Sequence, residues 1–278
     1  MPVPLIGLET FVYQYRLEKI AKVFGRHQVA IDGVDLEVQR GERVALIGPS
    51  GAGKTTLFRM LNCTLRPTSG KLWINGDEVS DLHGKTLRAA RRKIGTIYQQ
   101  HNLVPRLRVI HNVLSGNLGS WSTLRSLISL MRPREIELAY NALRQVGIEG
   151  KIFTRTDELS GGQQQRVAIA RVLIQNPEVI LADEPVSSVD PSLATVIVKL
   201  LLDIGQETHK TFLVNLHSVD LALAYFPRVI GIKEGKVLFD LSPDKISDGL
   251  LEELYSGHLP QNHREKVPDE ESGTLVYH

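Results

Sequence analysis

Apolar residues recur along this chain in two spacings, and these spacings predict strands that alternate with helices. Short alternating segments over 15–38 indicate antiparallel strands joined by glycine-containing turns. The continuous apolar run over 43–48 is typical of a buried parallel strand, and the spacing over 55–65 that follows it predicts a helix. A further small hairpin is expected over 68–79.

The alternation of strand and helix resumes in the second half of the chain. Strands are expected over 178–185 and 210–218, a strand pair over 228–240, and helices over 192–207 and 219–226. Such alternation favours a mostly parallel sheet that helices cover on both faces. The predicted fold class is therefore α/β, with a mostly parallel sheet and an N-terminal antiparallel β subdomain.

The middle of the chain has a different pattern, with helical segments separated by Gly, Pro and Ser. Helices are expected over 123–131 and 134–148. We interpret this region, about 101–165, as an α-helical subdomain inserted into the α/β core. The basic run over 88–93 is expected to be a solvated helix face just before a strand, where it could contact lipid headgroups or a membrane protein.

The ends of the chain differ in composition from this core. Residues 1–15 show no clear period and are expected to be an N-terminal extension, and 251–278 is expected to be a flexible polar tail. The remaining residues, 16–250, are expected to form one domain with the helical insertion inside it.

Composition narrows the classes of protein that fit. The net charge of +2 is too small to favour nucleic acid as a partner. No apolar run approaches the length of a spanning helix, about 18 residues, and the N-terminus lacks the features of a signal peptide. The single cysteine, Cys63, cannot form an internal disulfide and is expected to be a core residue. We expect a cytoplasmic protein, soluble or peripheral to a membrane.

A glycine-rich loop follows the strand expected over 43–48. "GPSGAGKT" matches the phosphate-loop pattern G-x-x-x-x-G-K-[ST] between a strand and a helix. Glycines let backbone N–H groups turn toward phosphate oxygens, and the helix N-terminus adds partial positive charge. Lys54 is expected to reach the β- and γ-phosphates, and the Thr55 hydroxyl to bind Mg²⁺. The residues expected to bind ATP here are Gly48, Pro49, Ser50, Gly51, Ala52, Gly53, Lys54, Thr55 and Thr56.

Two adjacent carboxylates end the apolar strand expected over 178–185. Asp183 and Glu184 stand at the carboxyl end of that strand, where open α/β sheets bind ligands. A pair of carboxylates at such a place is costly unless a cation lies nearby. We expect Asp183 to hold Mg²⁺, partly through water, and Glu184 to act as the general base on the attacking water.

These motifs occur with others, and the combination resembles a known family. "GPSGAGKTT", "LSGGQQQRV", "ILADEP", "SSVD" and "LH" follow one another in the order and spacing of ATP-binding-cassette (ABC) ATPases, over about residues 17–245. The Ser-Gly-Gly-Gln signature is the most specific part, since other P-loop classes such as kinases and GTPases lack it. The resemblance implies the ABC ATPase fold, with ATP and Mg²⁺ as cofactors.

The resemblance also implies roles for single residues. Phe24 stands where the family places an aromatic residue that stacks on adenine, although a core position would suit it equally. Gln99 matches the glutamine that contacts Mg²⁺ and the water, although its neighbour Gln100 makes this match ambiguous. His217 matches the switch histidine that contacts the γ-phosphate. The expected catalytic residues are therefore Glu184, His217 and Gln99.

The signature implies a homodimer with two composite sites. In ABC ATPases two subunits pack head to tail, so that each signature faces the phosphate loop of the other subunit. Ser160, Gly161, Gly162 and Gln163 would then contact the ATP bound by the partner, at the start of a helix expected from about Gln163. Asp190 matches the loop that crosses between the two subunits.

The resemblance extends to a class of transporter. The segments "QQHNLVPRLRVIHNVLSGNLG" and "VNLHSVDLALAYFPRVIGIKEGKVLFD" are similar to the ATPases of phosphonate importers, a subfamily that includes relatives for phosphite or hypophosphite. This likeness implies integral membrane permease subunits as partners, a periplasmic binding protein as an indirect one, and a peripheral position at the cytoplasmic face of the bacterial inner membrane. The alternatives are the ATPase of an amino-acid importer or a lipoprotein-releasing complex, and a soluble ABC protein without a permease.

Overall fold

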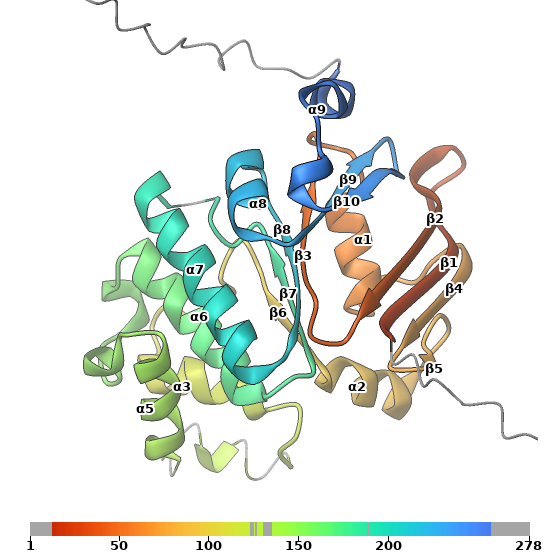
Figure 1. Cartoon of the computed structure of the whole chain (residues 1–278). Helices are drawn as coiled ribbons and strands as arrows, with labels where there is room; N and C mark the ends of the chain where they lie inside the picture. Colours follow the sequence, from red (N-terminus) through yellow and green to blue (C-terminus); the bar gives the residue numbers. More distant parts are fainter. Residues whose placement is uncertain (1–12, 123–124, 126, 130–134, 188, 257–278) are drawn as a thin grey trace, which may run out of the picture.

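Two β-sheets flank helix α1 (Lys54–Leu61) in the computed structural model of this chain (Figure 1). The structure describes residues 13–122, 125, 127–129, 135–187 and 189–256. The central sheet has six strands in the order β10–β9–β3–β8–β7–β6. Their bounds are β3 (Arg43–Ile47), β6 (Ile94–Ile97), β7 (Val179–Asp183), β8 (Thr211–Asn215), β9 (Arg228–Lys233) and β10 (Lys236–Leu241).

The central sheet is mostly parallel, as the alternation of strands and helices predicts. Strands β9, β3, β8, β7 and β6 run in one direction, and β10 adds an antiparallel edge. The carboxyl ends of the five parallel strands therefore lie at one edge of the sheet. The glycine-rich loop, the acidic pair and the strand-end histidine all follow strands of this set.

Apolar side chains on the central strands alternate between two cores. Along β3, Val44 and Leu46 join the core that contains α1, whereas Ala45 and Ile47 join the core on the other face. That second face is covered by α6 (Gly161–Gln175), α7 (Pro191–Thr208) and α8 (Val219–Tyr225) (Figure 1). Both faces of the sheet are covered, which explains why its strands are almost wholly apolar.

The second sheet is antiparallel and packs on the other side of α1. Its order is β2–β1–β4–β5, with β1 (Tyr13–Phe24), β2 (Gln28–Gln39), β4 (Ser69–Ile74) and β5 (Asp77–Glu78). The hairpin expected over 68–79 is β4 with β5, and β4 also pairs with β1. The first strand begins at Tyr13, so the expected boundary between extension and domain at residue 15 falls inside β1.

Helix α1 is held between the sheets by apolar packing and by a hydrogen bond. The Tyr15 hydroxyl on β1 donates to the Leu61 carbonyl at 3.1 Å. Cys63 follows the helix and is only 8% exposed, and burial raises the pKa of its thiol to about 11. The prediction that Cys63 is a core residue is confirmed, since a thiol so protected from ionisation is a poor nucleophile at neutral pH.

The inserted region is helical in the part that the structure describes. Helix α5 (Ile136–Gln145) confirms the helix expected over 134–148, and it packs with α3 (Val109–Leu114) and α6. The helix expected over 123–131 falls largely outside the described residues. Because α6 is one helix from Gly161 to Gln175 that packs with α3 and α5, a subdomain boundary at 165 divides a single helix.

Two further helices bear on the sequence predictions. Helix α2 (Gly84–Arg92) buries none of its residues and precedes β6, which confirms that the basic run over 88–93 is a solvated face. Helix α9 (Asp248–Tyr255) corrects the expectation of a flexible tail from residue 251, because Leu254 is buried against the core. The tail beyond 256 lies outside the described residues. None of the described helices is long and apolar enough to cross a bilayer.

Candidate functional site

The loop between β3 and α1 has a shape that two of its glycines make possible. Gly48 has a φ of +149°, and a Cβ atom there would lie 2.1 Å from the Ile232 carbonyl oxygen on β9. Gly53 has a φ of +104°, and its Cβ would lie 2.4 Å from the Ala30 carbonyl oxygen on β2. Side chains at either position would collide with backbone. The loop is therefore clamped between the two sheets in a curved conformation.

Lys54, at the start of α1, is turned back onto this loop. Its Nζ donates to the carbonyl oxygens of Gly48 at 2.6 Å and Pro49 at 3.0 Å, and the residue is only 5% exposed. Burial lowers the pKa of Lys54, and the carboxylates of Glu184 and Asp183 oppose that shift. A buried cation whose partners are neutral carbonyls is well placed to exchange them for phosphate oxygens.

The carboxyl ends of β7 and β8 bring two polar residues face to face. Asp183 and Asn215 are paired in register, and Asn215 Nδ2 donates to Asp183 Oδ1 at 2.7 Å. Burial raises the pKa of Asp183, the hydrogen bond from Asn215 opposes this rise, and the Glu184 charge adds to it. Within the described residues, Asn215 Oδ1 is buried and has no hydrogen-bond partner.

Glu184 is held in a strained conformation next to a histidine. Its φ is +51°, and its N–H donates to the Asn215 carbonyl at 3.1 Å. Glu184 Oε1 lies 2.6 Å from His217 Nε2, with 15% of the Glu184 side chain and 50% of the His217 side chain exposed. Backbone strain of this kind costs of order 1–3 kcal/mol and is concentrated at functional sites. The arrangement places a carboxylate, oriented by an imidazole, at the edge of the sheet where its charge acts on Lys54.

The remaining residues expected near the nucleotide lie on two different sheets. Gln99 and Gln100 occupy an exposed turn just after β6, the neighbour of β7, so both lie at the same sheet edge as Asp183. Phe24 ends β1 and is half-buried, with Lys22 Nζ 5.3 Å from its ring centroid. A half-buried ring is more accessible for stacking than a fully buried core residue.

The signature residues begin α6 rather than join the phosphate loop. The helix starts at Gly161, two residues before the expected start, and Ser160 is its N-cap. Gln163 N donates to Ser160 Oγ at 3.4 Å, and Ser160 N donates to Gln163 Oε1 at 3.2 Å, which makes a capping box. Helix α6 packs with α3, α5 and β6, whereas α1 packs with β2 and β7. The two glycine motifs of one chain thus belong to different packing units.

Asp190 has a clear structural role as the N-cap of α7. Its Oδ1 accepts hydrogen bonds from Leu193 N at 2.9 Å and from the Ser192 hydroxyl at 2.5 Å, and the latter bond lowers the pKa of Asp190. The starts of α6 and α7 are also packed together, since a Cβ on Gly162 would lie 2.3 Å from Leu193 Cδ2. The carboxylate of Asp190 is therefore engaged within its own chain.

The sheet edge fits a magnesium ion that is shared with a nucleotide. No group of three or more His, Cys, Asp or Glu able to hold a metal ion is found among the described residues. Mg²⁺ is usually bound by one or two protein oxygens together with substrate phosphates and water. Asp183 and Thr55 offer oxygen ligands of this kind. Burial raises the pKa of Asp183, and a nearby cation would oppose that shift by stabilising the carboxylate.

Asn215 belongs to this edge although no motif of the sequence predicts it. It holds the Asp183 carboxylate and accepts the Glu184 N–H, so it orients both acidic residues. Its signal in the sequence is an amide that directly follows the apolar residues 212–214 at the end of β8, where burial of an amide requires a hydrogen-bond partner.

Known proteins resemble this chain over nearly its whole length. The model of the ABC transporter family matches residues 31–187. The phosphonates import ATP-binding protein PhnC 2 of Halalkalibacterium halodurans is 42% identical, covering 86% of this chain and 98% of that protein. The phosphonates import ATP-binding protein PhnC of Wolinella succinogenes is 40% identical, covering 94% of this chain and 97% of that protein. PhnC of Pseudomonas fluorescens is 45% identical, covering 84% and 88%.

Solved structures agree with the architecture. The ATP-binding cassette MJ0796, in a dimeric post-hydrolysis state bound to ADP and Pi, has a TM-score of 0.70 and is 33% identical, covering 82% of this chain and 98% of that chain. The protein cbiO1 from Clostridium perfringens, part of the ABC transporter complex cbiONQ, has a TM-score of 0.74 and is 29% identical, covering 89% and 96%. The expected fold is therefore confirmed.

Proposed function

Because this chain belongs to the ABC transporter family of ATP-hydrolysing subunits, we propose that it powers an importer of phosphonates or of related reduced phosphorus compounds such as phosphite. The observation that carries this proposal is the 40–45% identity to phosphonate import ATP-binding proteins over most of both chains. The cargo itself need not touch this chain, since a permease and a binding protein would select it.

Binding of ATP rests on the clamped loop and its lysine. The backbone N–H groups of residues 50–56 and the N-terminus of α1 would receive the phosphates, and Lys54 Nζ would exchange its two carbonyl partners for phosphate oxygens. The half-buried Phe24 ring would stack on adenine. Asp183 and Thr55 would hold Mg²⁺, with Gln99 nearby on the same edge. That ion supplies positive charge to the phosphates.

Hydrolysis requires a group that takes a proton from water, and Glu184 is the best placed. Its carboxylate oxygen Oε1 lies 2.6 Å from His217 Nε2, and its backbone N–H donates to the Asn215 carbonyl. Side chain and backbone are therefore both held at a fixed position. A base positioned in this way typically contributes 10²–10⁴-fold to rate. His217 would also contact the γ-phosphate, as its half-exposed ring allows.

A second copy of the chain completes the site in this proposal. The loop and the signature lie in different packing units, so the capped N-terminus of α6 is free to face a nucleotide held by another subunit. Ser160 and the N–H groups of Gly161 and Gly162, next to Gln163, would contact that nucleotide. The dimeric MJ0796 cassette supports this arrangement. Asp190 would contribute through the position of α7, because its carboxylate caps that helix.

The transporter context supplies the other partners. We infer integral membrane permease subunits that receive force from the helical region, a periplasmic binding protein that acts through them, and a place at the cytoplasmic face of the inner membrane. The test is uptake by cells that carry this chain with its own permease and binding protein. Methylphosphonate or phosphite uptake should require the chain and be lost in Glu184→Gln. Uptake of an amino acid without any phosphonate or phosphite uptake would contradict the proposed cargo.

A further inference from the structure

Helix α9 is the last element that the structure describes, and it packs at the sheet edge that carries the phosphate loop, residues 48–55. It contacts β9, the strand next to β3. Figure 1 shows it at the end of the central sheet where the loop between β3 and α1 lies. Leu254 is fully buried in the core on the α6 side of the sheet, and Tyr255 packs against the same core. The helix therefore has a fixed place beside the loop.

The end of β9 and the turn after it hold the phosphate loop at two points. The Ile232 carbonyl oxygen lies against Gly48, where a Cβ atom would come within 2.1 Å of it. Gly235 N donates to the Ala52 carbonyl at 2.9 Å, near the other end of the loop. The segment 232–235 is therefore the surface on which the curved loop rests, and any shift of this segment would be felt at both ends of the loop.

Lys233 belongs to this segment, and its side chain reaches α9. Its Nζ donates to the Glu253 carbonyl at 2.5 Å and to the Ser256 hydroxyl oxygen at 2.6 Å. Both acceptors lie at the C-terminus of α9, where carbonyl groups lack partners within the helix and the helix dipole favours a cation. Lys233 therefore fixes the end of α9 to the residue that directly follows Ile232.

Tyr255 brings a hydroxyl of α9 to the loop itself. Among the residues that the structure describes, the hydroxyl oxygen is buried and has no full hydrogen-bond partner. Burial raises the pKa of Tyr255, and the Gly48 backbone opposes the rise, so the hydroxyl lies beside the first glycine of the loop. Only a donor lowers the pKa of a phenol, and the group involved is therefore the Gly48 N–H. A buried hydroxyl is costly without a hydrogen bond, so the hydroxyl and the loop gain from a closer approach.

The position of the loop matters for affinity because its N–H groups must converge on the phosphates. Gly48 and Gly53 both have positive φ angles, so the loop has a conformation that a free chain would seldom adopt. Ordering a loop on binding costs affinity, and contacts that already exist in the nucleotide-free chain avoid this cost. The segment 232–235 provides such contacts directly, and α9 provides them through Lys233 and Tyr255.

We propose that α9 stabilises the phosphate loop in its nucleotide-binding conformation, and that Lys233 and Tyr255 are positioning residues that act through Ile232 and Gly48. This inference rests on the proposed binding of ATP at the loop. Docking of α9 and binding of nucleotide then favour the same loop conformation, so each stabilises the other. Loss of either contact of α9 weakens nucleotide binding and leaves the chemical step unchanged, because Glu184 and His217 lie on other strands' ends.

The test is titration with ATP and steady-state hydrolysis by the full chain, with variants that each remove one contact. Lys233→Met removes the cation at the end of α9, and Tyr255→Phe removes the hydroxyl while its ring still packs on the core. Each variant should bind ATP about fivefold more weakly and raise KM by the same factor with kcat unchanged. Lys233→Arg keeps a cation that can donate to the Glu253 carbonyl, and it should restore most of the affinity.

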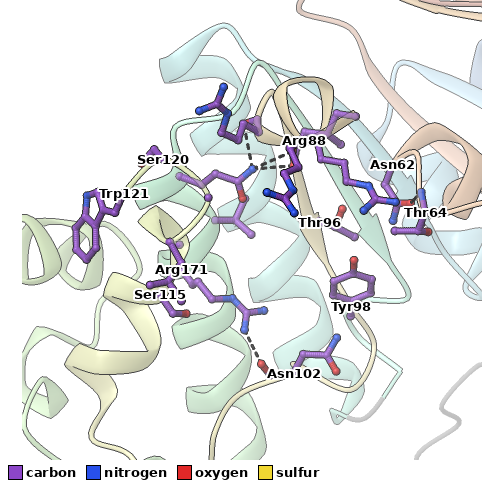
Figure 2. A pocket seen from close by; sticks show the side chains of 18 residues that line it. Asn62, Thr64, Arg88, Thr96, Tyr98, Asn102, Ser115, Ser120, Trp121 and Arg171 are labelled. Atoms are coloured by element: carbon purple, nitrogen blue, oxygen red, sulfur yellow. Dashed lines mark hydrogen bonds between the residues drawn. The ribbon is translucent and has the colours of Figure 1, made fainter. Parts of the chain in front are cut away.

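Two matched controls make the same kinds of change elsewhere. Arg88→Met removes an exposed cation of α2 at the cleft between α2 and α6 (Figure 2), and no residue of α9 or β9 is among the described residues that line this cleft. Tyr140→Phe removes a hydroxyl from an exposed residue of α5. Both controls should bind ATP as the wild type does.

Hydrogen exchange of residues 249–255 gives a second readout. ADP should slow exchange in α9 of the wild type and the controls, and less so in Lys233→Met and Tyr255→Phe. If both variants bound ATP as tightly as the controls, or if ADP left exchange in wild-type α9 unchanged, the role of α9 would be refuted while ATP binding at the loop stood. A lower free energy of unfolding with an unchanged KM would likewise refute it, because the contacts would then be structural only. A wild type that binds no ATP would contradict the proposed function, and this inference with it.

Discussion

His217 Nε2 lies 2.6 Å from Glu184 Oε1, although the two residues follow different strands of the central sheet. The contact exists because β7 and β8 are parallel neighbours whose carboxyl ends meet at one edge. Glu184 is further fixed by its N–H bond to the Asn215 carbonyl and by its left-handed backbone. The carboxylate is thus positioned from two sides, which is what a general base requires.

The Glu184–His217 pair predicts two different losses of activity. Glu184→Gln should bind ATP but lower the rate of phosphate release by about 10²–10⁴-fold, because the amide cannot take a proton from water. His217→Ala should lower turnover less, since the carboxylate remains but loses the imidazole that orients it. Phosphate release under saturating ATP is the measurement, with Glu207→Gln on the exposed face of α7 as control. Wild-type turnover in Glu184→Gln would remove the residue from the mechanism.

Lys54 should determine nucleotide affinity. Replacing it by Ala removes the buried ammonium that donates to the loop carbonyls and would donate to phosphate. Hydrogen bonds to charged groups contribute about 1.5–3 kcal/mol, so ATP should bind roughly 10- to 100-fold more weakly. Titration with ATP would measure this, and Lys85→Ala on the exposed start of α2 is the matched control. Equal affinity for the two variants would contradict the role of the loop lysine.

The composite site predicts a dimer that depends on Ser160. Glu184→Gln with ATP and Mg²⁺ should form a dimer by light scattering, because the nucleotide is held but not cleaved. Adding Ser160→Arg should keep the protein monomeric, since the larger side chain would project from the N-terminus of α6 toward the partner. Ser160→Ala is the control, because both changes remove the same capping hydroxyl, at a cost of about 1 kcal/mol. A dimer that forms equally with Arg at this position would argue against the composite site.

Gly48 should be required for stability as well as for binding. In Gly48→Ala the Cβ would meet the Ile232 carbonyl oxygen at 2.1 Å, at a φ that L residues rarely adopt. Backbone must move to relieve this contact, so we expect the free energy of unfolding to fall by about 3 kcal/mol. Gly150→Ala is the control, because nothing lies within 4 Å of its Cβ position. Denaturant melts without nucleotide measure both, and a loss no larger than that of Gly150→Ala would show that the loop adapts.

Asp183 predicts a pH dependence of stability with a definite sign. Burial raises the pKa of Asp183 in the folded chain above its ordinary value, even with Asn215 and Lys54 opposing the shift. The folded state therefore binds the proton more tightly than the unfolded state does. Stability should fall as pH rises from the unfolded pKa, about 4, through the folded pKa, and remain lower above it.

Asp183→Asn should accordingly stabilise the nucleotide-free protein at pH 7.5 while abolishing hydrolysis. The gain should shrink in acid, where the wild-type carboxyl is protonated as well. Denaturant melts at pH 7.5 and pH 4 measure the effect, with the exposed Asp203→Asn as control. A variant less stable than the wild type at pH 7.5 would show that the carboxylate stabilises the fold without a nucleotide.

Much of the fold and of the site follows from local patterns. Apolar spacing predicts most strands of the central sheet and the helices α1, α5, α7 and α8, because it directly reflects which faces are buried. The phosphate loop and the acidic pair are also readable, because glycine, lysine and carboxylate stand at fixed positions relative to a strand end. Errors occur at boundaries. Helix α6 begins at Gly161 through its capping box, and the short α9 continues through residues expected to be tail.

Local residue patterns are enough to predict the order of elements and the residue types that a nucleotide requires. Only the folded chain shows that Asn215 holds Asp183 and that His217 meets Glu184. The same holds for the cleft that arginines of α2 and α6 line, with no carboxylate among its described lining residues. These contacts cannot be predicted locally because they join residues far apart in the chain. Strand order and helix packing set their distances, and apolar periodicity carries no information about which strands become neighbours.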